Sequence, residues 1–405
     1  MANGMGSLMV GATGLRSSQT ALNTTAHNLS NVNTEGYTRQ QITFADSTYA
    51  NVFSKSLNKG KYGLGVDIDA ISRIRNEFID RSYRTESSRL GFYESQANAV
   101  YEVEDWFGEM QGVTYQQHIT NLYNAVNELT KNPTSTIARS SLIQNATAFI
   151  DRSEAIYSGL KDYQVTLNTE VNNMVEKINS LGQKIYNLNK GIVKVEAEGV
   201  ERANDLRDSR DLALDELSKY IDIDYYETKD GEVIVSAENV PFITKNDIAK
   251  MSVREEGTYG LLIPQWEGYQ QDVYNFDKQA NNANDTDKGK LKGLLIARGV
   301  IEVNYTDIPV MPERADYDLT TEQGMAEYNS AMDAYQQKQD YYNKYIEPSA
   351  ILSAIAGFDK LVNGIVTAMN DVLCPETTMD TTKRAHRCRW QYIKGREVCI
   401  QCIDT

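Results

Sequence analysis

The densest group of side chains with coordination chemistry in this sequence consists of four aspartates, Asp205, Asp208, Asp211 and Asp215. Carboxylates three or four residues apart share one face of a helix, and oxygen ligands of this kind suit a hard cation such as Ca²⁺. Arg207 and Arg210 are interleaved among them. Because opposite charges at this helical spacing attract each other, mutual ion pairs are the simpler expectation.

The second candidate is a cysteine cluster in the tail. The chain has four cysteines, and they are Cys374, Cys388, Cys399 and Cys402. Zinc accepts thiolates and imidazole, so Cys388, Cys399 and Cys402 with His386 could bind it, and the CxxC pair could be redox-active. A closed zinc site normally has two tight ligand pairs, whereas this segment has one. We expect no metal here, and a metal-binding or redox protein that uses these cysteines is the alternative function.

The remaining sequence gives no sign of catalysis. His27 and His118 are far apart and in unlike contexts. No nucleophile motif, phosphate-binding loop or dinucleotide fingerprint is present. We therefore predict a protein that is not an enzyme, with no catalytic residues and no cofactor.

Composition narrows the possible partners. The net charge of −15 over 405 residues disfavours nucleic acid, because no excess of Lys and Arg is available to displace phosphate counterions. No cleavable signal peptide is legible, and no apolar run approaches the ~20 residues of a membrane span. These rules alone predict a cytoplasmic protein without a membrane span.

The N-terminal helix that the sequence predicts has a leucine seam, formed by residues seven apart: Leu8, Leu15, Leu22 and Leu29. A seam of this kind packs against a partner helix. The other faces carry Ser, Thr and Asn, so they too suit contact with protein. Gly36 ends the pattern and can supply a turn with positive φ.

Periodicity predicts a mainly α fold, with long antiparallel helices forming a coiled-coil-like rod and a small inserted β domain. The longest seam runs from Val171 to Val195, and residues 325–346 and 351–372 are its predicted antiparallel partners. Residues 275–290 are predicted to be an exposed loop or linker. The expected domains are the N-terminal axial helix and turn (1–40), an extended arm (41–73), a helical rod (74–220 with 321–373), a β-rich insertion and linker (221–320), and a Cys-rich basic tail (374–405).

Two motifs resemble those of a known family. Residues 21–39, ALNTTAHNLSNVNTEGYTR, closely resemble the N-terminal signature of the flagellar axial proteins, although Glu35 stands where proline is usual. Residues 203–211, ANDLRDSRD, and 289–295, GKLKGLL, are similar to hook-associated members at the hook–filament junction. The family-motif residues in the stretch 203–211 are Asn204, Asp205, Leu206, Arg207, Asp208, Arg210 and Asp211.

The resemblance implies a structural protein of the bacterial flagellum. Such a protein is exported through the flagellar type III apparatus without a cleaved signal peptide, is extracellular, and self-assembles as a ring at the hook tip. Its partners would be other copies of itself, the hook protein and a second junction hook-associated protein. The residues implied to pack against subunits or partners are those of the leucine seam and Asn28, Asn31, Asn33, Gly36 and Tyr37.

The C-terminal segment departs from the family pattern. Family members end in a second long helix that packs against the N-terminal one and that is expected to bind the export chaperone. Here the similarity stops near Cys374, and the tail has no heptad. We expect a truncated or frameshifted end, doubtful chaperone binding, impaired assembly, and residues 1–40 that are disordered or held by a neighbouring subunit in solution.

Overall fold

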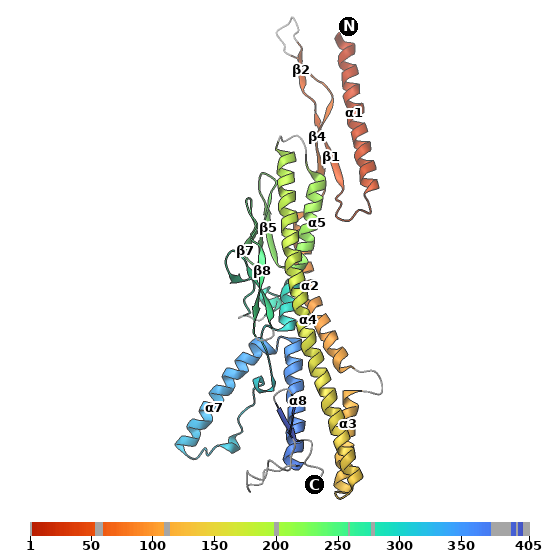
Figure 1. The fold of residues 1–405 in the computed structure, drawn as a ribbon. Coiled ribbons are helices and arrows are strands. Elements are labelled where there is room, and N and C mark those ends of the chain that lie inside the picture. The colour runs from red at the N-terminus through yellow and green to blue at the C-terminus, as the bar shows by residue number, and fades with distance from the viewer. Residues whose placement is uncertain are drawn as a thin grey trace. The chain divides into compact units, whose positions relative to one another are not determined.

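The computed structural model describes residues 2–52, 60–108, 114–197, 202–257, 260–276, 280–373, 390–393 and 396–399. Over these residues the chain is mainly helical, with long helices and small antiparallel sheets (Figure 1), as the sequence predicted. The α-helices are α1 (Ala2–Ser30), α2 (Glu77–Phe107), α3 (Tyr115–Lys131), α4 (Thr136–Glu196), α5 (Asn204–Tyr220), α6 (Lys290–Arg298), α7 (Glu322–Tyr341) and α8 (Ala350–Leu373).

The strands form five small sheets over the described residues. They are β1 (Gln40–Asp46), β2 (Tyr49–Val52), β3 (Gly60–Gly63), β4 (Val66–Arg73), β5 (Ile223–Glu227), β6 (Val233–Ala237), β7 (Val240–Ile243), β8 (Met251–Glu256), β9 (Leu261–Trp266), β10 (Gln271–Asp272), β11 (Trp390–Ile393) and β12 (Arg396–Cys399). The pairings are β1–β4, β2–β3, β5–β6–β7, β8–β9–β10 and β11–β12. Strands β1 to β4 lie in or at the edge of the predicted extended arm and β5 to β10 lie in the predicted β-rich insertion, whereas β11 and β12 lie in the tail, for which no strand was predicted.

The chain divides into two compact units, which are described separately. Unit 1 comprises residues 1–91, 175–251 and 266–271, and unit 2 comprises residues 92–174, 252–265 and 272–405. The boundaries expected from the sequence for five domains remain a prediction.

In unit 1, helix α4 contributes the core against the β5–β6–β7 sheet. Its seam residues Ile178, Leu181, Ile185 and Ile192 are buried, and Phe242 of β7 packs onto Gly182, where any larger side chain would collide with the ring. Strands β6 and β7 are joined through Glu238 and Asn239, which both have positive φ. Two such residues are typical of the tight turn whose twist suits a hairpin.

In unit 2, aromatic side chains join the helices. Tyr115 of α3 packs on Phe149 of α4 and on Phe358 of α8, and Phe107 at the end of α2 also contacts Phe358. The N-terminal half of α8 is buried, including Ile351 and Leu352. The predicted seam of residues 351–372 therefore packs only in its first half.

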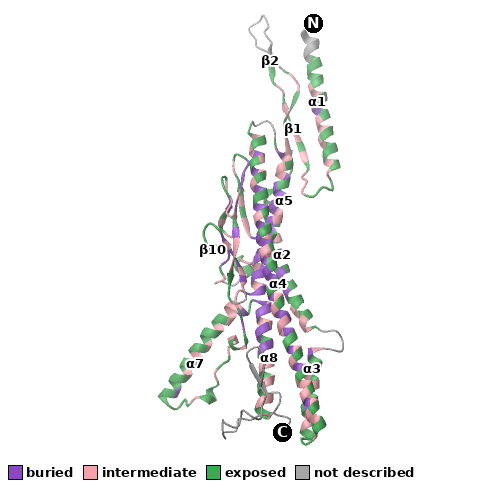
Figure 2. Cartoon of the chain, viewed as in Figure 1, coloured by how far each residue is buried: buried purple, intermediate pink, exposed green. Residues whose placement is uncertain are grey.

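Helix α7 does not match its predicted role. Residues 325–346 were expected to lie along the long helix, yet α7 is mostly exposed (Figure 2) and its one buried residue is Gly324. It packs instead on the segment before it, where Tyr317 meets Tyr328 edge to face and Lys338 Nζ donates to the carbonyl of Thr306. Heptad spacing indicates a helix face that can pack. It does not determine whether that face packs against a long helix or against a nearby loop.

Two further expectations need correction. The predicted exposed linker of residues 275–290 ends in buried chain, since Asp287 is 1% exposed and Lys288 is 9% exposed next to α6. Helix α8 is also long and apolar enough to cross a membrane by length and composition alone. The prediction that no such stretch exists was too strong, although the burial of its first half is typical of a core helix.

Candidate assembly site

The two sequence motifs meet in unit 1, although 170 residues separate them. The backbone N–H of Thr38, within the N-terminal signature, donates to Asp208 Oδ2 of α5 at 3.1 Å. Gly36 has φ +78°, and a Cβ placed there would lie 3.1 Å from Leu212 of α5. The predicted positive-φ turn is confirmed, and it requires glycine for its conformation and for this close approach. We call the region around Gly36, Thr38, Asp208 and Leu212 the motif junction.

Asn28 holds the signature turn closed. Its Nδ2 donates to the carbonyl of Gln40 at 2.9 Å, and the Gln40 N–H donates back to Asn28 Oδ1 at 2.9 Å. The Tyr37 hydroxyl also donates to Asn28 Oδ1 at 2.7 Å, and the Tyr37 ring packs edge to face on His27. One asparagine thereby fixes the end of α1 to the start of β1.

The other signature residues are less buried. Asn31 Nδ2 donates to the carbonyl of His27 at 3.0 Å and so caps the end of α1. Asn33 is exposed. His27 is accounted for by this packing, as expected for a histidine beside a helix seam.

The aspartates of α5 pair with arginines from outside their own helix. Arg73 at the end of β4 lies 2.7 Å from both Asp208 and Asp211. Arg84 of α2 lies 2.7 Å from Asp215, and Arg75 contacts Asp211 and Asp215 at 3.4 Å. The expectation of mutual pairs within the motif was therefore wrong in its partners, because those three carboxylates face β4 and α2.

The arginines of the motif point to a different side of α5. Arg207 makes a bidentate pair with Glu196 at the end of α4, with both distances 2.7 Å. Glu227 of β5 bridges Arg207 at 2.6 Å and the buried Arg210 at 2.9 Å. Helix α5 therefore joins the N-terminal arm and α2 on one face to the β-sheet and α4 on the other.

Burial and neighbouring charges shift several pKa values here. Burial alone would raise the pKa of Asp211, but Arg75, Arg73 and Arg84 together hold it below its ordinary value. Burial, with the Asp208 and Asp205 charges, raises the pKa of Tyr37. Asp211 is thus held ionised as a structural partner of these arginines.

The remaining motif residues have structural contacts or face solvent. Asn204 Nδ2 donates to the carbonyl of Ile71 in β4 at 2.9 Å, and Leu206 packs over Gly191 of α4. Asp205 is exposed.

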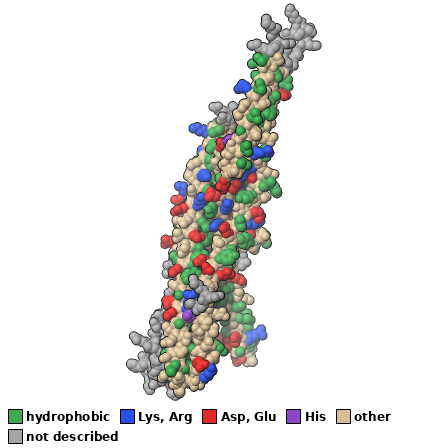
Figure 3. All heavy atoms as spheres, turned by 90° about the vertical axis from the view of Figure 1, so that its right-hand side faces the viewer, with side chains coloured by type: hydrophobic (Ala, Val, Ile, Leu, Met, Phe, Trp, Pro, Cys, Tyr) green, Lys and Arg blue, Asp and Glu red, His purple; other side chains and the backbone are tan. Residues whose placement is uncertain are grey.

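The leucine seam of α1 faces solvent. Leu8, Leu15 and Leu29 are 74% exposed and Leu22 is 66% exposed, and Figure 3 shows hydrophobic side chains along this part of the surface.

The polar face of α1 packs on the arm. Ser17 is 6% exposed and donates to the carbonyl of Val66 at 3.3 Å, and Thr13 donates to the carbonyl of Leu64 at 3.4 Å. Gly65 lies against Thr13, and a side chain there would collide with it. The face that contacts the arm is thus the Ser and Thr face, and the leucines remain available.

Sequence patterns indicated less clearly that asparagines of α4 would bind backbone groups of the strand regions. Asn168 in unit 2, and Asn179 and Asn189 in unit 1, each donate an amide hydrogen to one strand-region carbonyl and accept a backbone N–H. Their spacing is close to three helical turns, so one face of α4 presents all three. The regular spacing of these asparagines could have indicated from the sequence that they share one face. Arg73 and Arg84 could likewise have been recognised as candidate partners for the aspartates of α5.

Cys374, Cys388, Cys402 and His386 lie outside the described residues, and the side chain of Cys399 is likewise not described. Within the described part of the chain, no group of three or more His, Cys, Asp or Glu could hold a metal ion.

The fold and the motif junction define a helical protein with an exposed leucine seam on its N-terminal helix, and its N-terminal signature matches a known class. Residues 8–38 match the family described as flagella basal body rod protein, and residues 100–333 match the helical domain of flagellar hook-associated protein FlgK. Because the second match covers more than half of the sequence, the chain belongs to the FlgK family of flagellar hook-associated proteins.

The names of curated relatives agree with this family assignment. Flagellar hook-associated protein 1 of Bacillus subtilis is 30% identical over 74% of this chain and 61% of its own length, and that of Salmonella typhimurium is 26% identical over 52% and 37%. The chain thus matches less than two thirds of these relatives. A solved structure of the flagellar hook junction protein FlgK from Burkholderia pseudomallei has a TM-score of 0.43, with 19% identity over 54% of this chain and 38% of that one.

Proposed function

We propose that this chain joins hook to filament, self-assembling as a ring at the hook tip with the leucine seam of α1 as a packing surface. Membership of a hook-associated family makes it a structural component of the flagellum. The carrying observation is that α1 leaves all four leucines exposed while its polar face is fixed to the arm. Apolar seams of this kind are stabilised by a partner helix.

The proposed partners follow from the proposed position at the hook tip. Other copies would lie beside the chain in the ring, the hook protein would lie on one side, and a second junction hook-associated protein on the other. The protein would be extracellular after export without a cleaved signal peptide, and its role would be structural and not catalytic.

Binding to hook fragments tests the proposal. The intact chain should cosediment with purified hook fragments, and Leu15→Asp with Leu22→Asp should reduce the bound amount at least about tenfold, because a charge cannot enter an apolar seam. Asn23→Asp, an exposed change on the same helix, should bind as the parent does. The proposal fails if the parent chain does not cosediment, or if the leucine variant binds as well as the control.

A further inference from the structure

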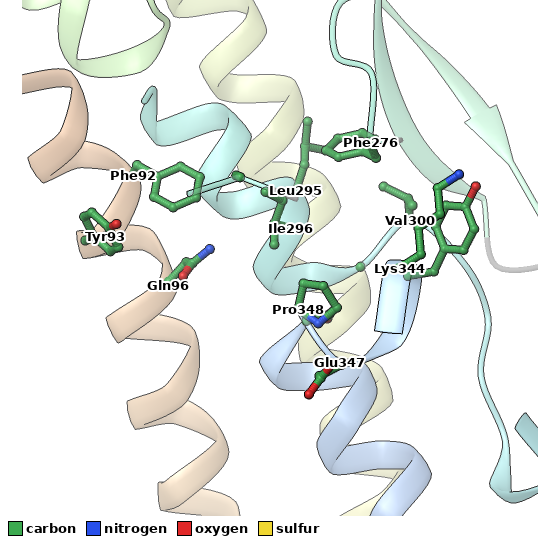
Figure 4. A pocket seen from close by; sticks show the side chains of 14 residues that line it. Phe92, Tyr93, Gln96, Phe276, Leu295, Ile296, Val300, Lys344, Glu347 and Pro348 are labelled. Carbon is green, nitrogen blue, oxygen red and sulfur yellow. The ribbon is translucent and has the colours of Figure 1, made fainter. Parts of the chain in front are cut away.

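Unit 2 contains an aromatic cavity of about 390 Å³. Residues of α2, of α6 and the segment after it, and of the turn between α7 and α8 line it (Figure 4). Four aromatic side chains contribute to the lining: Phe92, Tyr93, Phe276 and Tyr345. Its volume falls within the ~300–1,000 Å³ range of pockets that hold ligands or side chains of partners.

A π-helical turn forms one wall of this cavity. Residues Tyr342–Ile346 adopt it, and the N–H of Glu347 donates to the carbonyl of Tyr342, five residues earlier, at 2.9 Å. Insertions of this kind are rare and are frequently found at functional sites. The turn places Lys344 and Glu347 in the lining, so a cation and an anion border an aromatic surface.

The same unit carries a matching ligand segment. Pro309-Val-Met-Pro312 is a PxxP sequence, and Val310 is 70% exposed and Met311 60% exposed. The flanking residues Ile308 (φ −73°, ψ 120°) and Glu313 (φ −80°, ψ 133°) have extended backbones near the polyproline II region. Two prolines preorganise the segment, which lowers the entropy lost when it binds.

Aromatic grooves recognise PxxP segments in this extended conformation. The exposure of Val310 and Met311 shows that the segment does not occupy the cavity of its own chain. A second copy supplies a complementary ligand, because exposed Glu313 and Arg314 follow the segment and the cavity presents Lys344 and Glu347.

We propose that the PxxP segment, residues 309–312, of one copy docks into the aromatic cavity of the next copy. The contact is head to tail, since it joins two different surfaces of one chain, and repeated contacts of this kind close into a ring when the rotation permits. The inference deepens the proposed function and rests on it, because ring assembly supplies the neighbouring copy.

Photo-cross-linking of the intact chain tests the contact. The photoreactive residue p-benzoylphenylalanine replaces Met311, and equal amounts of ¹⁴N-labelled and ¹⁵N-labelled chain are mixed and irradiated. We expect cross-linked peptides of mixed isotope that join position 311 to the peptides containing Phe92 or Tyr345. Cross-links of a single isotope only, or links that map outside the cavity, would overturn the inference.

Charge reversal adds a second measurement, sedimentation of the self-association equilibrium. Lys344→Glu should weaken self-association at least about tenfold, and adding Glu313→Lys to the same chain should restore it, because the exchanged charges attract again. Val310→Asp with Met311→Asp should also weaken it, whereas Ile137→Asp, at an 81% exposed position on α4, should not. Failure of the restoration contradicts the contact.

Cosedimentation with hook fragments separates the two proposals. A chain that binds hook fragments through its leucine seam but gives no cross-link in the cavity would overturn this contact and leave the proposed function standing.

Discussion

Asp208, Asp211 and Asp215 lie along one face of a helix and depend on arginines that come from β4, the turn after it and α2. Such pairs contribute little when exposed, but a partly buried carboxylate that loses its charge leaves its arginine partners desolvated and uncompensated. The side chain of Asp211 is 12% exposed and contacts Arg73, Arg75 and Arg84. The cluster therefore connects the arm to the body through charge, not through apolar packing.

Asp211→Asn should lower the free energy of unfolding by roughly 2–4 kcal/mol, because it leaves buried arginines with fewer partners. Chemical denaturation monitored by circular dichroism measures this change. Asp205→Asn removes the same charge from an exposed position of the same helix, so its effect should stay within about 0.5 kcal/mol. Equal effects of the two variants would show that the cluster does not stabilise the fold.

The same carboxylate predicts how stability depends on pH. The pKa of Asp211 is lower in the folded chain than the ordinary value of 3.8, since three arginines outweigh the effect of burial. The unfolded chain therefore binds its proton first as acid is added, so this contribution is fully present above the unfolded pKa and is lost as pH falls through the folded pKa. Unfolding measured from neutral to strongly acidic pH should show a shallower acid loss in Asp211→Asn than in the parent, and superimposable profiles would contradict the assignment.

At the scale of elements, α4 binds the β5–β6–β7 sheet through asparagine side chains as well as through its apolar seam. Asn189 donates to the carbonyl of Val233 at 2.8 Å, and it accepts from the Val233 N–H at 3.1 Å and from Arg210 at 3.2 Å. An amide can satisfy both backbone groups of a strand residue at once, so its position sets where the strand meets the helix.

Asn189→Ala should cost about 1–3 kcal/mol, because it leaves a buried N–H, a buried carbonyl and part of a buried guanidinium without partners. Thermal or chemical unfolding checks the loss. Asn187→Ala, an exposed position on the same helix, is the matched control and should change stability by less than about 0.5 kcal/mol. If both variants unfold alike, the amide pairing is not a significant contributor.

Helix α1 should be the least protected helix of unit 1. It buries Ser17 but leaves its leucine seam in solvent, and isolated helices are marginal in water without apolar packing. In a dilute monomer we predict that amides from Leu15 to Leu29 exchange far faster than those from Ile178 to Ile192 in the buried part of α4. Hydrogen exchange detected by mass spectrometry measures both segments together, and strong protection of Leu15–Leu29 would refute the prediction.

Considered as a whole molecule, the chain is acidic, with a net charge of −15, and mainly helical. Among the described residues, helix α8 meets the length and composition of a membrane span. Its residues Ile351, Leu352 and Ile355 are fully buried in unit 2, so transferring the helix into lipid would remove them from that core. This arrangement favours packing within protein.

The purified chain should therefore stay in the bottom fraction of a density gradient when it is mixed with vesicles of neutral phospholipid. Flotation of the mixture on a density gradient measures the bound fraction, and the same chain centrifuged without vesicles shows the background level. Recovery of most of the intact chain with the vesicles would indicate that α8 enters the bilayer.

The sequence by itself determined the mainly helical class, the glycine at the signature turn and the family. These features depend on local periodicity, on short motifs and on a φ angle that only glycine adopts easily, and all of them are properties of neighbouring residues. Heptad spacing along residues 325–346 was equally clear, yet it did not reveal that α7 packs on a nearby segment and stays mostly exposed.

Only the tertiary structure decided which charges meet, and it also showed that the polar face of α1, and not its leucines, contacts the arm. Asp208 pairs with Arg73 across 135 residues, and the N–H of Thr38 reaches the same carboxylate across 170. A sequence lists candidate partners within a few helical turns, but contacts at this separation exist only after the chain folds back on itself. Charge spacing along α5 therefore predicted ion pairs, and the packing of β4 and α2 against it chose the partners.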